Sequence, residues 1–363
     1  MDTACGGGQT GFRVSFEQAG VASARAGGSH RMASPADEVL NVRGLAVRYQ
    51  MGGSRQVHAV ENASFTIRAG ESLGILGESG CGKTTLALSL LRLLPPSARF
   101  AGGSILYQGN DILGLDEREL GRIRGAEISL IPQEPGIALC PVVQVGDQIA
   151  EVLRAHRPWK YEQRRSEARA LLSQVRLPEV TRIFRSYPHQ LSGGELQRVA
   201  IAQAIACQPK LIVADEPTTA LDSTVQAEIL TLLKELKARE KTSFIFISHN
   251  PAVLAEVADR VLVMYGGEII EEGGAREVLN QPEHPYTQAL LKCAPRRGNE
   301  VSRTLRRTLL SIPGEVPELS ETPSSCLFEP RCEQRMAECR ERSPGTYGTG
   351  ESRHVRCFKY RNN

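Results

Sequence analysis

Residues 77–84 (GESGCGKT) have the composition and spacing of a loop that binds phosphate groups. Glycines allow backbone N–H groups to turn towards phosphate oxygens, and a helix that follows the loop adds positive potential at its N-terminus. Lys83 brings a positive charge to the β- and γ-phosphates, and the Thr84 hydroxyl can ligate Mg²⁺. We therefore predict a nucleotide-binding loop made of Gly77, Glu78, Ser79, Gly80, Cys81, Gly82, Lys83 and Thr84, with Thr85 directly after it.

Two acidic side chains, Asp215 and Glu216, come directly after a short apolar stretch. A carboxylate at such a strand end can hold Mg²⁺ through water, and a second one can polarise an attacking water as general base. The two acids could also simply begin a turn at Pro217, but the phosphate loop upstream favours catalysis. His249 follows the next apolar stretch and can donate to a γ-phosphate, and the long Gln133 amide can reach Mg²⁺ or water. We predict catalytic roles for Glu216, His249 and Gln133, and Mg²⁺ ligation by Thr84, Gln133 and Asp215.

The elements that must position these groups alternate between short apolar runs and longer amphipathic ones. We expect strands at residues 39–42, 45–49, 63–67, 73–76, 210–214, 243–248 and 261–264. We expect helices at residues 83–94, about 116–124, 161–175, 195–207, 225–237 and 251–258. This alternation predicts an α/β fold with a mainly parallel sheet covered by helices on both faces, and with antiparallel strands at one edge.

Composition and charge exclude several classes of protein. The formal net charge of +3 is too small for a strong electrostatic field towards nucleic acid, so we expect no nucleic-acid partner. No apolar run reaches the roughly 18 to 20 residues that a membrane helix needs, and no secretory signal is visible. The nine cysteines favour thiols or metal ligands over disulfides. Residues 1–37, rich in Gly, Ala and Ser, are expected to be a disordered extension.

The sequence LSGGELQ at residues 191–197 lies between the phosphate loop and the two acids, and this order resembles the ATP-binding-cassette (ABC) ATPases. The resemblance covers about residues 39–275 and implies a P-loop ATPase that uses ATP and Mg²⁺, with a helical subdomain at about residues 134–200. It implies that Ser192, Gly193 and Gly194 contact the γ-phosphate bound by a second subunit, from the start of a helix. Residues 220–222 match the family's dimer-communication loop and include Asp222. Tyr49 is the candidate to stack on adenine, although a core tyrosine is the alternative.

Three further short sequence motifs point to one group within this family: RIRG at residues 122–125, HPYT at 284–287 and IPG at 312–314. They are similar to the ATPase subunits of bacterial dipeptide and oligopeptide importers, a group that includes nickel importers. The resemblance implies a peripheral protein at the cytoplasmic face of the inner membrane. Its partners would be a second, homologous ATPase subunit, two membrane permeases and an extracytoplasmic substrate-binding protein. The alternatives are import of nickel or another small solute, and a soluble ABC ATPase without a transport role.

Residues 276–363 are expected to form a C-terminal extension after the ATPase domain of residues 38–275. This extension contains Cys326, Cys332, Cys339 and Cys357, which resemble the four-cysteine cluster of that family's C-terminal extension. Four thiolates can hold a [4Fe–4S] cluster or a tetrahedral Zn²⁺. The resemblance favours a structural iron–sulfur cluster, whereas free thiols and a redox sensor remain alternatives.

The sequence also departs from the family at three positions. Cys140 stands where an asparagine is usual, Ile137 replaces a polar or small residue, and Asn250 follows His249 in place of an aspartate. None of these changes removes a catalytic group. They concern how closely the loop after Gln133 couples to the permease.

Overall fold

The computed structural model describes residues 38–52, 55–219, 221–293, 312–315, 317, 320 and 324–361. These described residues all belong to one compact unit. The predicted disordered extension, residues 1–37, and Ala220 of the predicted communication loop lie outside the described residues.

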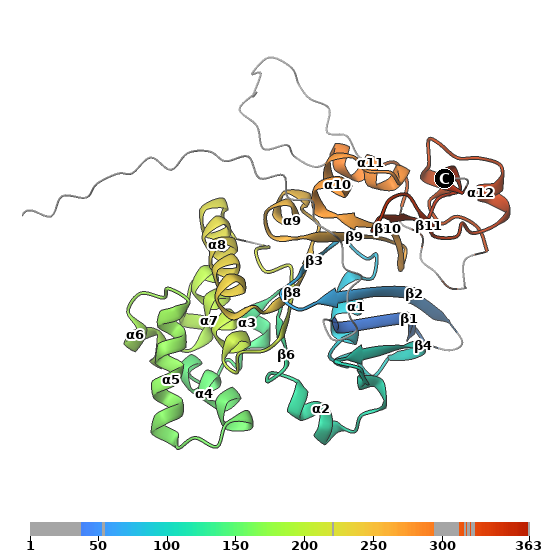
Figure 1. Ribbon diagram of the computed structural model, residues 1–363. Helices are drawn as coiled ribbons and strands as arrows, with labels where there is room; N and C mark the ends of the chain where they lie inside the picture. The colour runs from blue at the N-terminus through green and yellow to red at the C-terminus, as the bar shows by residue number, and fades with distance from the viewer. Residues whose placement is uncertain are drawn as a thin grey trace, which may run out of the picture. The chain divides into compact units, whose positions relative to one another are not determined.

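The described strands form two sheets (Figure 1). The antiparallel sheet has the order β2-β1-β4-β5, with β1 Glu38–Gln50, β2 Gln56–Arg68, β4 Ala98–Tyr107 and β5 Asn110–Asp111. The larger sheet has the order β11-β12-β10-β9-β3-β8-β7-β6. Its strands are β3 Ser72–Leu76, β6 Ile128–Ile131, β7 Leu211–Asp215, β8 Ser243–Ser248, β9 Arg260–Tyr265, β10 Glu268–Gly274, β11 Tyr347–Gly348 and β12 His354–Val355. The pairs among β9, β3, β8, β7 and β6 are parallel, and β10 to β12 add antiparallel pairs, so the predicted fold class is confirmed.

Side chains of the parallel strands alternate between two apolar cores, one on each face of the larger sheet. In β8, for example, Phe244 and Phe246 belong to one core, whereas Ile245 and Ile247 belong to the other. Successive side chains of a strand point to opposite faces, and a strand covered on both faces is therefore apolar throughout. All six residues of β8 are buried. This double burial holds the carboxyl ends of the strands, where the predicted site residues begin, in fixed positions.

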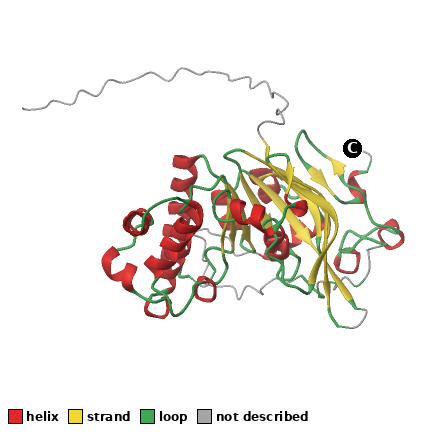
Figure 2. Cartoon of the chain, turned by 90° about the horizontal axis from the view of Figure 1, so that it is seen from below, coloured by secondary structure: helices red, strands yellow, loops and turns green. Residues whose placement is uncertain are grey.

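Several helices, among them α1, α9 and α10, pack against strands of the larger sheet, and another group of helices packs mainly against itself. The bounds of the helices are α1 Lys83–Ser89, α2 Glu117–Ile123, α3 Pro135–Ala138, α4 Val145–His156, α5 Tyr161–Gln174, α6 Val180–Arg185, α7 Gly193–Ile205, α8 Ser223–Glu240, α9 Pro251–Val257, α10 Ala275–Asn280, α11 Pro285–Cys293 and α12 Glu338–Glu341. Helices α4 to α7 pack against one another, and Figure 2 shows this group beside the strands. They occupy the stretch in which a helical subdomain was predicted. No helix within the described residues combines the length and apolarity needed to cross a membrane.

Several predicted elements differ from the observed ones, and the strand predicted at residues 63–67 is the last part of the longer strand β2. The helix predicted at residues 83–94 ends at Ser89, before the prolines that were expected to stop it. The chain turns earlier because Arg92 adopts a left-handed conformation with φ of 50° and Leu93 N–H donates to the Leu88 carbonyl. The two strands predicted at residues 39–42 and 45–49 are one strand, β1, which passes through irregular pairing near Gly44 without a break.

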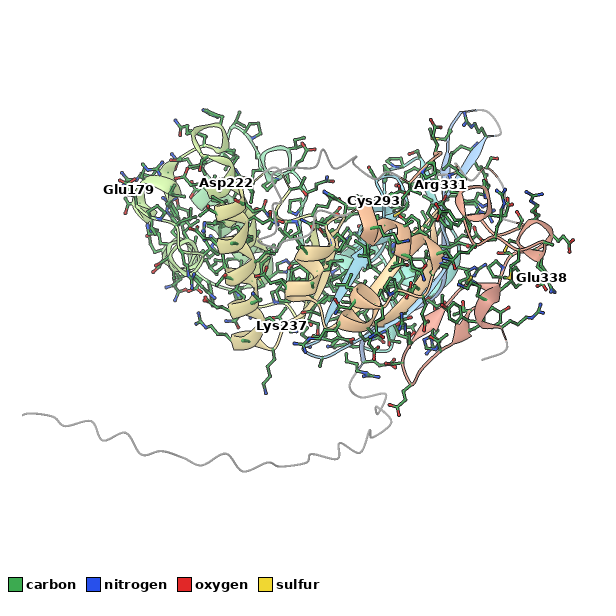
Figure 3. The ribbon with its side chains drawn as sticks, turned by 90° about the horizontal axis from the view of Figure 1, so that it is seen from above. Glu179, Asp222, Lys237, Cys293, Arg331 and Glu338 are labelled. Carbon is green, nitrogen blue, oxygen red and sulfur yellow. The ribbon has the colours of Figure 1, made fainter. Side chains whose placement is uncertain are left out.

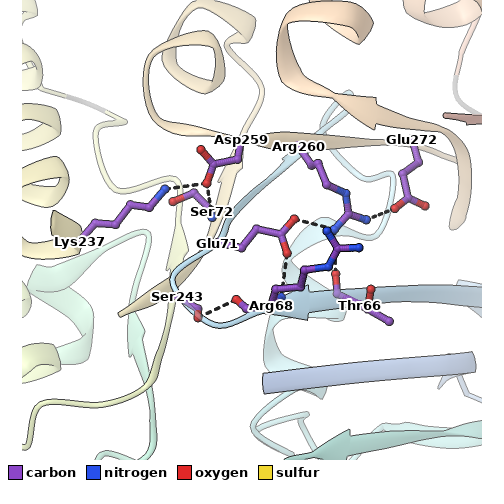
Figure 4. A network of polar contacts seen from close by, with 9 residues as sticks. All are labelled: Thr66, Arg68, Glu71, Ser72, Lys237, Ser243, Asp259, Arg260 and Glu272. Carbon is purple, nitrogen blue, oxygen red and sulfur yellow. Dashed lines mark hydrogen bonds and ion pairs between the residues drawn. The ribbon is translucent and has the colours of Figure 1, made fainter. Parts of the chain in front are cut away.

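A polar network joins the turn between β2 and β3 to the rest of the larger sheet (Figure 4). Arg260 of β9 donates to Glu71 at 2.6 Å and also pairs with Glu272 of β10. Asp259 accepts from the Ser72 N–H at 2.8 Å and from Lys237 of α8 at 2.6 Å. Because β3 leads directly into the phosphate loop, these contacts fix the start of the strand that positions it.

Candidate nucleotide site

The phosphate loop runs from the end of β3 to the start of α1, the arrangement that its sequence predicts. Two of its glycines are required by close backbone contacts. A Cβ on Gly77 would lie 2.4 Å from the Met264 carbonyl oxygen, and Gly82 has φ of 103° with its Cβ position 2.2 Å from the Ala59 carbonyl oxygen. Lys83 is buried, and its Nζ donates to the carbonyl oxygens of Gly77 at 2.9 Å and Glu78 at 2.8 Å.

A cavity of about 390 Å³ opens beside this loop. The predicted site residues on its wall are Ser79, Gly80, Gly82, Lys83, Thr84, Thr85, Gln133 and Glu216. Residues on the wall that the sequence analysis did not select are Val57, His58, Ala59, Gly266, Gly267 and Pro317. Gly266 and Gly267 form the turn between β9 and β10, and both have positive φ. Two consecutive glycines directly after an apolar run could have identified this turn from the sequence. Pro317 carried no such signal.

Glu216 is the centre of a cluster of polar side chains beside the cavity. His249 Nδ1 lies 3.2 Å from Glu216 Oε1, and Gln133 Nε2 lies 3.4 Å from Oε2. Thr219, which the sequence analysis missed, donates its hydroxyl to Oε2 at 2.8 Å. Glu216 itself has φ of 46°, a left-handed conformation that is uncommon for a residue with a side chain. The three predicted catalytic residues therefore meet, at a carboxylate held in a strained turn.

Asp215, the last residue of β7, has the properties of a magnesium ligand. It is 4% exposed, and its Oδ1 has no hydrogen-bond partner among the described residues. Burial raises the pKa of Asp215, the Thr84 hydroxyl lowers it, and the neighbouring Glu216 charge raises it again. A buried carboxylate oxygen without a partner beside a threonine hydroxyl fits a hard cation. Thr84, Asp215 and Gln133 would hold Mg²⁺, which would supply positive charge to the β- and γ-phosphates.

Tyr49, the predicted adenine-stacking residue, lies next to the cavity but is absent from the residues described on its wall. Its hydroxyl is 3.3 Å from Thr85 Oγ1, and its side chain packs against the core that the antiparallel sheet shares with one face of the larger sheet. Val57, His58 and Ala59 of β2 form the wall on that side. The stacking role of Tyr49 remains a prediction.

Ser192, Gly193 and Gly194 stand at the start of α7 and do not line the cavity of their own chain. Ser192 is the N-cap: its hydroxyl accepts from the Glu195 N–H at 3.3 Å and contacts the Glu195 carboxylate at 3.0 Å. A Cβ on Gly194 would lie 3.0 Å from Val225 of α8. Asp222, which precedes α8 (Figure 3), accepts from two N–H groups of that helix's first turn at 3.0 Å each. Helix α7, which begins within the LSGGELQ signature of residues 191–197, is thus packed against the segment of the predicted communication loop.

The four cysteines of the C-terminal extension lie close enough to interact electrostatically. Burial, together with the neighbouring Cys339, Cys357 and Cys332, raises the pKa of Cys326 to about 12. The Cys326 N–H also donates to the Cys339 carbonyl at 3.0 Å. Within the described residues, no three His, Cys, Asp or Glu side chains are placed to hold one metal ion. The donor type therefore fits a metal cluster, but the positions of the donors do not.

Comparison with known proteins agrees with this geometry. Residues 60–219 match the family described as "ABC transporter", and residues 270–339 match "Oligopeptide/dipeptide transporter, C-terminal region". The chain is 45% identical to the oligopeptide transport ATP-binding protein OppD of Escherichia coli (strain K12), over 85% of this chain and 90% of OppD. The chain belongs to the ATP-binding subunits of oligopeptide and dipeptide ABC transporters. It is also 42% identical to the dipeptide transport ATP-binding protein DppD of Bacillus subtilis (strain 168), over 89% of this chain and 95% of DppD.

Two solved structures share the fold of this chain. The dimeric, post-hydrolysis ATP-binding cassette MJ0796 bound to ADP and Pi aligns with a TM-score of 0.59 and 30% identity, covering 65% of this chain and 99% of the cassette. The structure of cbiO1 from Clostridium perfringens aligns with a TM-score of 0.57 and 26% identity, covering 68% of this chain and 92% of that protein. The fold is therefore shared over about two thirds of this chain.

Proposed function

We propose that this chain hydrolyses ATP to drive the import of peptides across the bacterial cytoplasmic membrane. The observation that carries the chemistry is the cluster around Glu216. Its carboxylate, steadied by Thr219 and flanked by Gln133 and His249, would accept a proton from water as the water oxygen bonds to the γ-phosphorus. The bond between that phosphorus and the ADP oxygen breaks, and ADP and phosphate leave. The peptide cargo rests on the match to the peptide-transporter C-terminal region and on OppD and DppD.

A second ATPase subunit would complete each nucleotide site. The support is that Ser192, Gly193 and Gly194 form the N-terminus of α7 and do not line the cavity of their own chain. A helix N-terminus favours an anion, so it could serve the nucleotide of another subunit. MJ0796, which shares the fold, is described as dimeric. We propose a homologous but different partner subunit, with the signature of each chain serving the nucleotide of the other.

Membrane permeases would contact the segment that follows Gln133. Ile137 and Val142 lie there with 79% and 78% of their surfaces exposed, and Cys140 between them is exposed as well. Apolar side chains that stay in water on a short helix and its following loop favour a protein partner. Because Gln133 contacts Glu216, movement of this segment would reach the catalytic carboxylate. We propose that the chain acts at the cytoplasmic face of the inner membrane, with permeases and a substrate-binding protein.

A [4Fe–4S] cluster on the four cysteines, with Zn²⁺ as the alternative, is proposed from their donor chemistry alone, because the described side chains are not arranged around one metal ion. The support is the donor chemistry of four neighbouring thiols. Visible absorption of the full-length chain purified without oxygen distinguishes the possibilities, because an iron–sulfur cluster absorbs there and Zn²⁺ does not. Cys332→Ser is compared with Cys293→Ser, which changes an isolated thiol of α11. Lost folding or assembly only in the first variant supports a structural cluster, whereas intact transport with an altered redox response supports a sensor.

Transport by the assembled complex tests the cargo. The chain is purified with the products of neighbouring genes, reconstituted in proteoliposomes and supplied with the binding protein. Uptake of labelled di- and oligopeptides that requires ATP inside the vesicles is expected. Uptake of Ni²⁺ but not of peptides would move the assignment to the metal-importing branch. ATP hydrolysis that no permease stimulates would instead support the soluble ATPase alternative.

A further inference from the structure

The C-terminal extension forms part of the wall of the nucleotide cavity. Pro317 lines that cavity beside Gly266 and Gly267. A Cβ added to Gly266 would lie 3.0 Å from Leu327 Cδ1 and 3.9 Å from Pro317 Cγ, so the extension packs directly on this turn. The match to the ABC transporter family ends at residue 219 and includes none of these groups. The nucleotide site is therefore built from more than the ATPase domain.

Arg331 of the extension (Figure 3) forms a two-pronged ion pair with Glu78 of the phosphate loop. Its NH1 and NH2 nitrogens lie 2.9 Å and 3.2 Å from the two carboxylate oxygens. The Arg331 side chain is 5% exposed and that of Glu78 is 26% exposed. Arg331 also donates to the carbonyls of Ile312 and Pro313 at 3.1 Å and 2.9 Å. A bidentate pair between an arginine and a carboxylate is directional, and removal of one partner leaves a largely buried charge.

Tyr286 of α11 holds the same residue through its backbone. The Glu78 N–H donates to the Tyr286 hydroxyl at 2.9 Å. The Tyr286 ring is completely buried, and its centroid lies 4.6 Å from that of Tyr265 and 5.5 Å from that of Phe328. Phe328 lies further along the extension than α11, so the aromatic cluster attaches two separate parts of the extension to the end of β9. Two elements far apart in the sequence thus converge on one residue of the phosphate loop.

The position of Glu78 affects the phosphate loop because its carbonyl oxygen accepts a hydrogen bond from the ammonium group of Lys83. Lys83 Nζ donates to the carbonyl oxygens of Gly77 and Glu78. A shift of this peptide would change the direction of the lysine that faces the phosphates and the curvature of the loop behind it. We propose that Arg331 and Tyr286 are positioning residues of the nucleotide site and set the affinity of the chain for ATP by fixing Glu78. The proposal rests on the ATPase function and is independent of the cargo.

Nucleotide binding by the full-length chain tests this proposal with a fluorescent ATP analogue and Mg²⁺. Arg331→Ala and Glu78→Gln are each expected to raise the dissociation constant about tenfold, the scale of a lost charge-assisted pair. The double variant is expected to be no weaker than either single variant, because both changes remove the same interaction. Tyr286→Phe keeps the ring and removes only the hydroxyl, so we expect a rise of about threefold. In the assembled complex, the KM for ATP should rise while kcat stays near wild type.

Arg340→Ala is the matched control, because Arg340 is 67% exposed and pairs with Glu329 on the same extension. It should bind ATP as the wild type does. Wild-type affinity in Arg331→Ala, or additive losses in the double variant, would overturn the proposal. If Arg331→Ala unfolds the extension, as judged by limited proteolysis, Glu78→Gln and Tyr286→Phe decide the outcome alone. Failure of the wild-type chain to bind the analogue would count against the ATPase assignment itself.

Discussion

Glu216 Oε1 and His249 Nδ1 lie 3.2 Å apart at the carboxyl ends of two neighbouring parallel strands. The strands β7 and β8 are in register there, with Asp215 opposite Ile247, and the Glu216 N–H donates to the Ile247 carbonyl at 3.0 Å. Backbone pairing thus determines the distance between the two side chains. We propose that this carboxylate, beside an imidazole at the edge of the cavity, takes a proton from water.

Replacement of Glu216 by glutamine tests its role as general base. Glu216→Gln keeps the size and the hydrogen bonds of the side chain but removes the proton-accepting charge. We expect ATP binding to persist while turnover in the assembled complex falls by about 10² to 10⁴. ATP should then remain bound in a closed dimer, which gel filtration with ATP and Mg²⁺ detects. Hydrolysis at the wild-type rate by this variant would remove Glu216 from the mechanism.

Thr219 is expected to orient the Glu216 carboxylate through its 2.8 Å hydrogen bond. Thr219→Val preserves the shape of the side chain and removes this bond, so we expect kcat to fall by about three- to tenfold with little change in KM. Thr231→Val is the control, because Thr231 donates only to the Ala227 carbonyl on the exposed face of α8. Equal effects of the two substitutions on kcat would show that Thr219 acts only through the stability of the fold.

Ser192 combines a structural task with the predicted contact to a second subunit. Ser192→Ala removes the N-cap of α7 and should lower the free energy of unfolding by about 1 kcal/mol. It should leave ATP binding by the isolated chain intact but reduce hydrolysis by the assembled complex. Asp116→Ala removes an equivalent capping box at α2 and serves as the control. Thermal unfolding should report similar losses in both variants, and a similar loss of hydrolysis in both would contradict the role in trans.

The parts of the fold that follow from local pattern were predictable from the sequence. The strands β3, β7, β8 and β9 are buried on both faces, and their apolar runs gave the sheet and the strand ends at which Asp215, Glu216 and His249 stand. Local pattern also identified the phosphate loop, whose glycines satisfy close contacts with Met264 and Ala59.

Long-range contacts and left-handed backbone turns explain what the sequence could not predict. Arg331 and Glu78 are separated by 253 positions, and neither residue belongs to a pattern that would pair them. Thr219 lies only three residues from Glu216, but its hydrogen bond to the Glu216 carboxylate depends on the left-handed turn at Glu216. No sequence pattern predicts that turn. The early end of α1 has the same cause, since it depends on the conformation of Arg92.

We expect the charged carboxylate of Asp215 to lower the stability of the fold, although the nucleotide site needs that charge to bind Mg²⁺. Burial raises its pKa in the folded chain above the value in the unfolded chain, so folding favours the protonated form. Its contribution to stability is therefore greatest below the unfolded pKa and is lost as the pH rises through the folded pKa. Above the folded pKa and without Mg²⁺, the charged group is buried beside Glu216, so Asp215→Asn should raise the melting temperature there.

The same substitution should weaken the stabilisation that ATP and Mg²⁺ give, because a neutral asparagine carbonyl is a weaker ligand for the cation than a carboxylate. Melting curves of both proteins, with and without ATP and Mg²⁺, measure this reversal. The wild type should gain more from the ligands than Asp215→Asn, and the order of the two melting temperatures should reverse. Asp259→Asn is the control, because Asp259 is a carboxylate at the start of β9 that contacts Ser72 and Lys237 and lies outside the nucleotide cavity. A metal-free Asp215→Asn variant less stable than the wild type would show that the charged form is favoured by contacts that outweigh its burial.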